Sequence, residues 1–131
     1  MYEKVTRSIR VRVEPRYLDE RSAPDENLFF WAYDVEIANE SRETVQLRAR
    51  SWHITDATGR VETVRGPGVV GEEPVIGPGE SFAYNSGCPL RTPSGFMVGA
   101  YEMETPKGER FSVDIPAFSL DRPGGPPRTF N

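Results

Sequence analysis

Three glycines spaced G-x-G-x-x-G, at Gly66, Gly68 and Gly71, are the residues whose spacing most directly suggests chemistry. Loops with this spacing hold a pyrophosphate when a strand precedes them and a helix follows, because the helix N-terminus presents free N–H groups to the anion. Here the next residues are EEPVIGPGE, in which Pro74 and Pro78 prevent a helix. We therefore favour a stiff structural loop whose glycines adopt positive φ. The alternative is a backbone nest that binds an anion without a helix.

The charges around the three glycines also disfavour an anion. Glu72 and Glu73 follow Gly71 directly, no lysine lies within the stretch, and the Gly-Lys-Ser/Thr sequence of a P-loop is absent. We keep Gly66, Gly68 and Gly71 as candidate ligands of a nucleotide, a pyrophosphate or a metal–phosphate. Binding of such a small molecule is our second hypothesis for the function.

Residues suited to metal binding or nucleophilic catalysis are few. His53 and Cys88 are the only histidine and cysteine in the chain, so a Cys/His zinc cluster cannot form. A nucleophilic Cys88 would depend on His53 as its base, and a single free cysteine is more often a small buried apolar residue. We expect no metal site, no cofactor and no enzymatic activity.

The length and composition fit one compact soluble domain. The chain has 131 residues, with a formal net charge of −4 and no run of basic residues, which argues against nucleic acid as a partner. We expect one domain over residues 1–120 and a Pro/Gly-rich tail over residues 121–131. The amino terminus lacks the apolar region of a signal peptide, no stretch reaches the roughly 18 apolar residues of a membrane span, and one cysteine fits a reducing compartment. The expected location is the cytoplasm, with no membrane contact.

Apolar residues alternate with polar ones along most of the chain, which is the pattern of half-buried strands. The segment LFFWAYDVEIAN is the clearest case, with Phe29, Trp31, Tyr33, Val35 and Ile37 on one face. In the segment that begins at residue 45 the apolar positions shift by one residue, which predicts a β-bulge or a crossing between sheets. No window of 11 or more residues keeps a helical period.

This pattern predicts an all-β fold, an antiparallel β-sandwich of seven or eight strands that is immunoglobulin-like or fibronectin type III-like. A closed barrel is the alternative. We expect Trp31 and Trp52 to lie in the core. If either were exposed beside Tyr84 or Tyr101, the aromatic surface could stack on a base or a sugar.

Several stretches resemble the bacterial ApaG family. They are RARSWHITDATGRVETVRGPGVVGEEPVIGPGESFAYNSG, LRTPSGFMVGAYEM and GERFSVDIPAFSL, and the combination of GPGVVGE with IPAFSL is especially specific. The resemblance covers residues 11–120 and implies a fibronectin type III-like sandwich. It also implies a link to diadenosine tetraphosphate metabolism and to cobalt and magnesium handling. Related domains in eukaryotic F-box proteins and in a DNA polymerase delta-interacting protein look like protein-interaction modules.

The leading hypothesis is therefore a non-enzymatic cytoplasmic sandwich that binds another protein, which the sequence does not identify. Loops, exposed apolar patches and unpaired strand edges are the surfaces through which such a fold binds.

Overall fold

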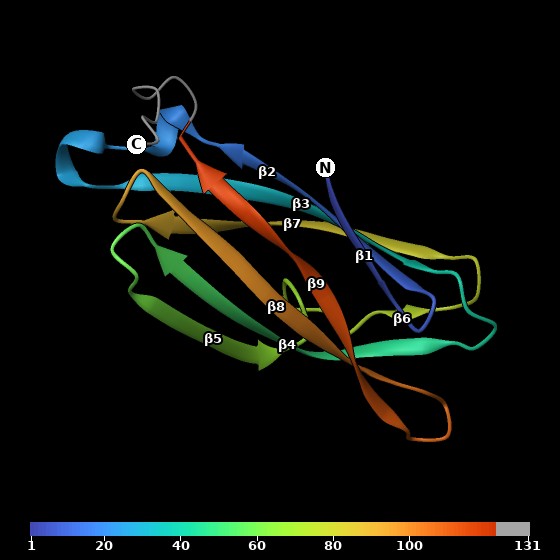
Figure 1. The fold of residues 1–131 in the computed structure, drawn as a ribbon. Coiled ribbons are helices and arrows are strands. Elements are labelled where there is room, and N and C mark those ends of the chain that lie inside the picture. The colour runs from blue at the N-terminus through green and yellow to red at the C-terminus, as the bar shows by residue number, and fades with distance from the viewer. Residues whose placement is uncertain (123–131) are drawn as a thin grey trace, which may run out of the picture.

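The computed structural model describes residues 1–122 and contains two facing antiparallel β-sheets (Figure 1). One sheet has the strand order β1-β2-β3-β7, and the other has the order β5-β4-β8-β9, with β6 also paired to β4. The strands are β1 (Tyr2–Thr6), β2 (Ile9–Tyr17), β3 (Phe29–Asn39), β4 (Val45–Asp56), β5 (Val61–Pro67), β6 (Val75–Ile76), β7 (Ser81–Leu90), β8 (Ser94–Glu104) and β9 (Arg110–Asp121).

The predicted sandwich is confirmed, with nine strands in place of seven or eight. The only helical elements of the described residues are two short 3-10 turns, η1 (Asp19–Arg21) and η2 (Pro24–Glu26). The predicted tail over residues 121–131 falls almost wholly on residues 123–131, which lie outside the described part of the chain, while Asp121 is the last residue of β9.

The core lies between the two sheets and is built by the alternation that the sequence displays. Every odd position of β3 from Phe29 to Ile37 is buried, and the inward residues of β2 are fully buried. Both tryptophans are also buried, each with 3% of its surface exposed, as expected. Tyr33, Trp52 and Phe118 form a cluster of tilted and edge-to-face rings at its centre, with ring centroids 5.5 to 5.8 Å apart.

The predicted irregularity in β4 is a β-bulge. The pairing of β4 with β8 shifts register between Leu47 and Ala49. Before the shift the buried positions are odd-numbered, as at Leu47, and after it they are even-numbered, as at Trp52. Because one extra residue reverses the two faces of a strand, the side chain of Arg50 shares the inward phase of Trp52.

The sequence pattern missed two segments that pair at sheet edges. β1 pairs with β2 although its residues are mostly exposed and do not alternate. The second half of β7 runs through Ser, Gly, Cys and Pro to Leu90 without an alternating pattern, and it pairs along β3. Proline is tolerated there because β7 is an edge strand, where one side of the backbone makes no ladder hydrogen bonds.

The strand directions bring three connections to one end of the sandwich. These are the β2–β3 connection, which carries η1 and η2, the β4–β5 turn and the β7–β8 turn (Figure 1). The β1–β2, β3–β4 and β8–β9 turns lie at the opposite end. No helix among residues 1–122 is long and apolar enough to cross a membrane.

Candidate functional site

The glycine loop, defined as residues 66–73, continues the edge of the sheet from β5 toward β6. Gly66 lies within β5 and pairs with Arg50 of β4. The N–H of Gly68 donates to the carbonyl of Arg48 at 2.9 Å, at the position of the bulge in β4. The loop therefore hydrogen-bonds to β4 where regular strand pairing stops.

A tight two-residue turn forms the tip of the glycine loop. Val69 N donates to Glu72 O and Glu72 N donates to Val69 O, both at 2.8 Å. The two residues between them, Val70 and Gly71, have φ values of 44° and 79°. Positive φ at both central residues is the geometry of a type I′ turn, and the buried Val69 side chain, 1% exposed, anchors the turn to the core.

Three N–H groups of the glycine loop are used internally. The amides of Gly68, Val69 and Glu72 all donate to main-chain carbonyls of the protein. Arg50 contributes its charge to the same loop, since its Nη1 donates to the carbonyls of Pro67 and Gly68, each at 2.9 Å. Two of the three fingerprint glycines have the positive φ expected of a structural loop, and Gly66 does not. Their assignment as anion ligands stays a prediction.

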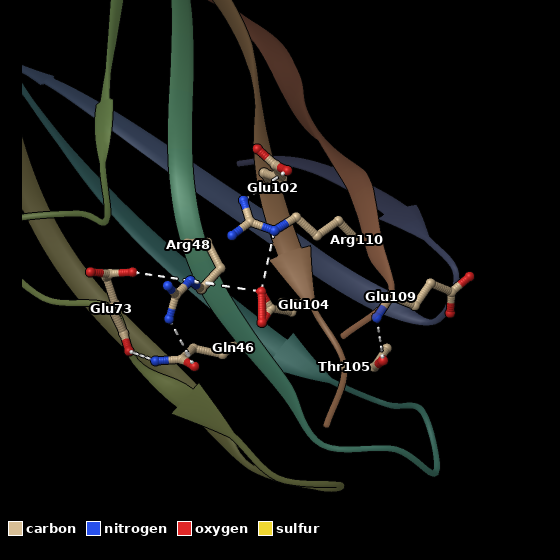
Figure 2. A network of polar contacts seen from close by, with 8 residues as sticks. All are labelled: Gln46, Arg48, Glu73, Glu102, Glu104, Thr105, Glu109 and Arg110. Carbon is tan, nitrogen blue, oxygen red and sulfur yellow. Dashed lines mark hydrogen bonds and ion pairs between the residues drawn. The ribbon is translucent and has the colours of Figure 1, made fainter. Parts of the chain in front are cut away.

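A network of charged side chains ties the glycine loop to the outer face of the second sheet (Figure 2). Arg48 Nε lies 3.3 Å from a carboxylate oxygen of Glu73, without hydrogen-bond alignment, and 4.0 Å from Glu104. Gln46 donates to the carbonyl of Glu73 at 3.0 Å, and Arg110 of β9 contacts Glu104 at 3.2 Å. Because these side chains are partly exposed, each pair contributes about 1 kcal/mol or less. The network orients the loop and leaves Glu73 already paired.

The two candidate nucleophile and base residues lie in different surroundings. Cys88 is buried in β7 opposite Trp31, and burial, followed by the charge of Glu62, raises the pKa of its thiol to about 12. His53 is exposed in β4, with its Nδ1 3.4 Å from the hydroxyl of Thr63. The geometry therefore does not pair them. Among residues 1–122, no group of three or more His, Cys, Asp or Glu side chains could hold a metal ion.

Tyr84 and Tyr101, which the sequence left open, turn inward. Tyr101 is fully buried, and its hydroxyl meets that of the partly buried Tyr84 in a short hydrogen bond between the two sheets. Burial raises the pKa of both hydroxyls, so that both stay protonated at neutral pH. These rings are parts of the core and form no exposed stacking surface.

A cleft of about 670 Å³ opens at the end of the sandwich where the three connections meet. We call it the end cleft. Its apolar residues are Leu28, Ile54, Pro89 and Leu90, which come from the β2–β3 connection, β4 and β7. The volume falls within the range of sites that bind small molecules or inserted side chains.

Charged residues of both signs surround the apolar part of the end cleft. Glu26, Arg60, Glu62 and Arg91 are all exposed, and within the described chain none of the four makes a salt bridge. Asp56 also lines the cleft, but its carboxylate already accepts hydrogen bonds from the Thr58 hydroxyl and from the amides of Thr58 and Arg60, which together with the charge of Arg60 lower its pKa. Four charged side chains that make no salt bridge within the described chain thus flank an apolar patch.

Sequence reasoning missed the end cleft because its residues come from four separate segments. No spacing along the chain connects Glu26 with Arg60 or Arg91. The available signal was indirect, since an antiparallel sandwich collects alternate connections at one end.

The fold defines the class of protein, which is a fibronectin type III-like β-sandwich. The end cleft lies where its β2–β3, β4–β5 and β7–β8 connections meet. The ApaG domain model matches residues 19–105, and the chain belongs to the ApaG family.

Relatives match the chain over nearly its whole length. Protein ApaG of Rhodospirillum centenum is 66% identical over 125 residues, which cover 95% of this chain and 96% of that relative. Protein ApaG of Rhodopseudomonas palustris is 59% identical over 131 residues and covers 100% of both chains. The crystal structure of an ApaA protein from Bordetella pertussis superposes with a TM-score of 0.85 at 43% identity, covering 94% of this chain and 97% of that one.

Proposed function

We propose that this chain is a non-enzymatic module that binds a protein partner through the end cleft. The observation that carries the proposal is the combination of an apolar patch with four exposed charges that make no salt bridge among the described residues. An apolar patch surrounded by charges without salt bridges suits a protein partner that supplies both apolar side chains and opposite charges. Because the free thiol fits a reducing compartment, we extend the proposal to the cytoplasm.

The competing function is binding of a nucleotide, pyrophosphate or metal–phosphate at Gly66, Gly68 and Gly71. The links that the ApaG resemblance implies with diadenosine tetraphosphate, cobalt and magnesium motivate it. Against it stand the internal hydrogen bonds of Gly68, Val69 and Glu72, because a bound anion would have to displace their acceptors.

Affinity capture tests the proposed function. The wild-type protein and a double variant, Glu62→Arg with Arg91→Glu, are immobilised and exposed to cell lysate, and captured proteins are quantified. Both positions are exposed, so the fold tolerates the changes. We expect a partner that the wild type retains and the double variant loses. Lys107→Glu, on the exposed β8–β9 turn at the opposite end, is the matched control.

A titration tests the competing function. ATP, diadenosine tetraphosphate and pyrophosphate are added with and without Mg²⁺ or Co²⁺, and the amides of the three glycines are followed by NMR. We expect no saturable shift at these amides. Saturation below millimolar ligand, together with capture that ignores the cleft variant, would replace the proposed function by the competing one.

A further inference from the structure

We infer that the end cleft receives an extended segment of the partner, which adds as a strand to the free edge of β5. The inference rests on the proposed function and names the form in which the partner binds. It follows from the free backbone of β5, the charges beside it and the apolar patch that it borders.

β5 is an edge strand of the second sheet. Among the described strands it pairs only with β4, so the other side of its seven residues has no strand partner. Such a side presents N–H and C=O groups to an added strand. At about 3.3 Å per residue, seven residues offer roughly 23 Å of template.

The facing edge strand, β7, is the poorer template at the cleft. β7 also pairs on one side only, with β3, but it reaches the cleft at Pro89 and Leu90. Proline has no N–H to donate. β5 reaches the cleft at Glu62, with Arg60 directly before its first residue, and its own proline, Pro67, is its last residue. The added strand therefore belongs to β5.

The core-facing residues of β5 connect its free backbone edge with the end cleft. Val64 packs against the core, and Glu62, two residues away, projects on the same side, close enough to Cys88 to affect its pKa. Side chains of an added strand alternate in the same way. One set of alternate residues would therefore face Glu62 and the apolar residues Ile54 and Leu90.

The charges of the end cleft select a segment that carries both signs. Glu26 and Glu62 call for a basic side chain, and Arg60 and Arg91 for an acidic one. With Asp56 included, three carboxylates outnumber two guanidinium groups, so a polyanion such as a nucleotide meets net repulsion. We therefore expect alternate positions of the segment to supply a basic, an apolar and an acidic side chain.

A displayed library of random dodecapeptides tests this inference. Selection on the immobilised wild type is expected to enrich peptides with that alternating pattern. Glu62→Arg should weaken binding of the selected peptide by about tenfold or more, and a new selection on this variant should replace the basic residue by an acidic one. Lys107→Glu should change neither result. Tryptophan fluorescence checks that each variant is folded.

Backbone methylation tests strand addition directly. Single N-methyl groups are placed in turn along the selected peptide, and affinity is measured by fluorescence anisotropy. Because only every second amide of an added strand points to its neighbour, we expect losses of about tenfold at alternate positions and small changes between them.

The outcomes separate the two proposals. Uniform methylation effects, binding that ignores Glu62→Arg, or a library without enrichment would overturn the strand-addition inference. If lysate capture still depends on the cleft in that case, the partner docks through a folded surface and the proposed function stands. If capture is also independent of the cleft, both proposals fail.

Discussion

Substituting each glycine of the fingerprint by alanine should affect stability to very different degrees. At Gly68 an added Cβ would lie 2.1 Å from the carbonyl oxygen of Glu72, which is the acceptor of the Val69 amide, and φ is +58°. The turn must then open. Positive φ costs an alanine about 1–2 kcal/mol, and loosening the buried Val69 costs about another 1.5 kcal/mol or more. We expect Gly68→Ala to lower the free energy of unfolding by about 3 kcal/mol.

The other two glycines have no comparable steric conflict. At Gly71 an added Cβ meets nothing within 4 Å, so only its φ of +79° opposes alanine. The cost of about 1–2 kcal/mol is partly offset by the reduced entropy of the unfolded chain, leaving a loss of about 1 kcal/mol. At Gly66 the new methyl group would lie 3.2–3.3 Å from the guanidinium of Arg50, with ordinary φ, so that group needs to shift by only a few tenths of an ångström. We expect a change there within about 0.5 kcal/mol of zero.

Val70 provides a control of opposite sign in the same turn. It is a β-branched residue at φ +44°, and half of its surface is exposed. Asparagine tolerates this conformation and is favoured before glycine in type I′ turns. Val70→Asn should therefore raise the free energy of unfolding by about 1 kcal/mol.

Urea unfolding followed by the fluorescence of Trp31 and Trp52, both buried, measures the whole series. When Gly68→Ala is unfolded by heat instead of urea, its melting temperature should fall by on the order of 10 °C. Equal losses at Gly66, Gly68 and Gly71, or a Gly68→Ala protein as stable as the wild type, would refute the structural interpretation of the loop. Losses of phosphate binding without losses of stability would favour an anion site.

Two further predictions concern the interior. Tyr84→Phe and Tyr101→Phe should each destabilise the protein by about 1–2 kcal/mol, because the remaining hydroxyl loses its buried partner. The double variant should lose less than the sum, and additive losses in a double-mutant cycle would contradict the coupling. Cys88, whose pKa is raised to about 12, should resist iodoacetamide at pH 8 in the folded protein and react once urea unfolds the chain. Rapid alkylation of the native protein would show a thiolate at odds with its burial.

Much of the fold could be predicted from local pattern. Alternation identified β3 and its inward face, and the change of phase in β4 indicated the bulge near Ala49. These features are encoded within a few residues, because side-chain period and turn chemistry act over that range. The family could also be identified from the sequence, and the domain match confirms it.

The segments that the pattern missed depend on partners far away in the chain. β1 and the second half of β7 lack clear alternation and become strands because β2 and β3 offer open backbone edges. Pairing between distant segments can override weak local preference. The glycine loop shows the same limit: its turn follows from its glycines, but the pairing of Gly68 with Arg48 could not be predicted from local sequence.

The sequence by itself determined an all-β fold with a glycine-marked loop, because hydrophobic period and turn residues are local properties. Only the tertiary structure decided which distant residues meet. Strand direction brings Glu26, Glu62 and Arg91 to one end of the molecule, leaves β5 with one strand partner among residues 1–122, and turns Tyr84 and Tyr101 toward each other. Such meetings arise from long-range packing, which no spacing along the chain records.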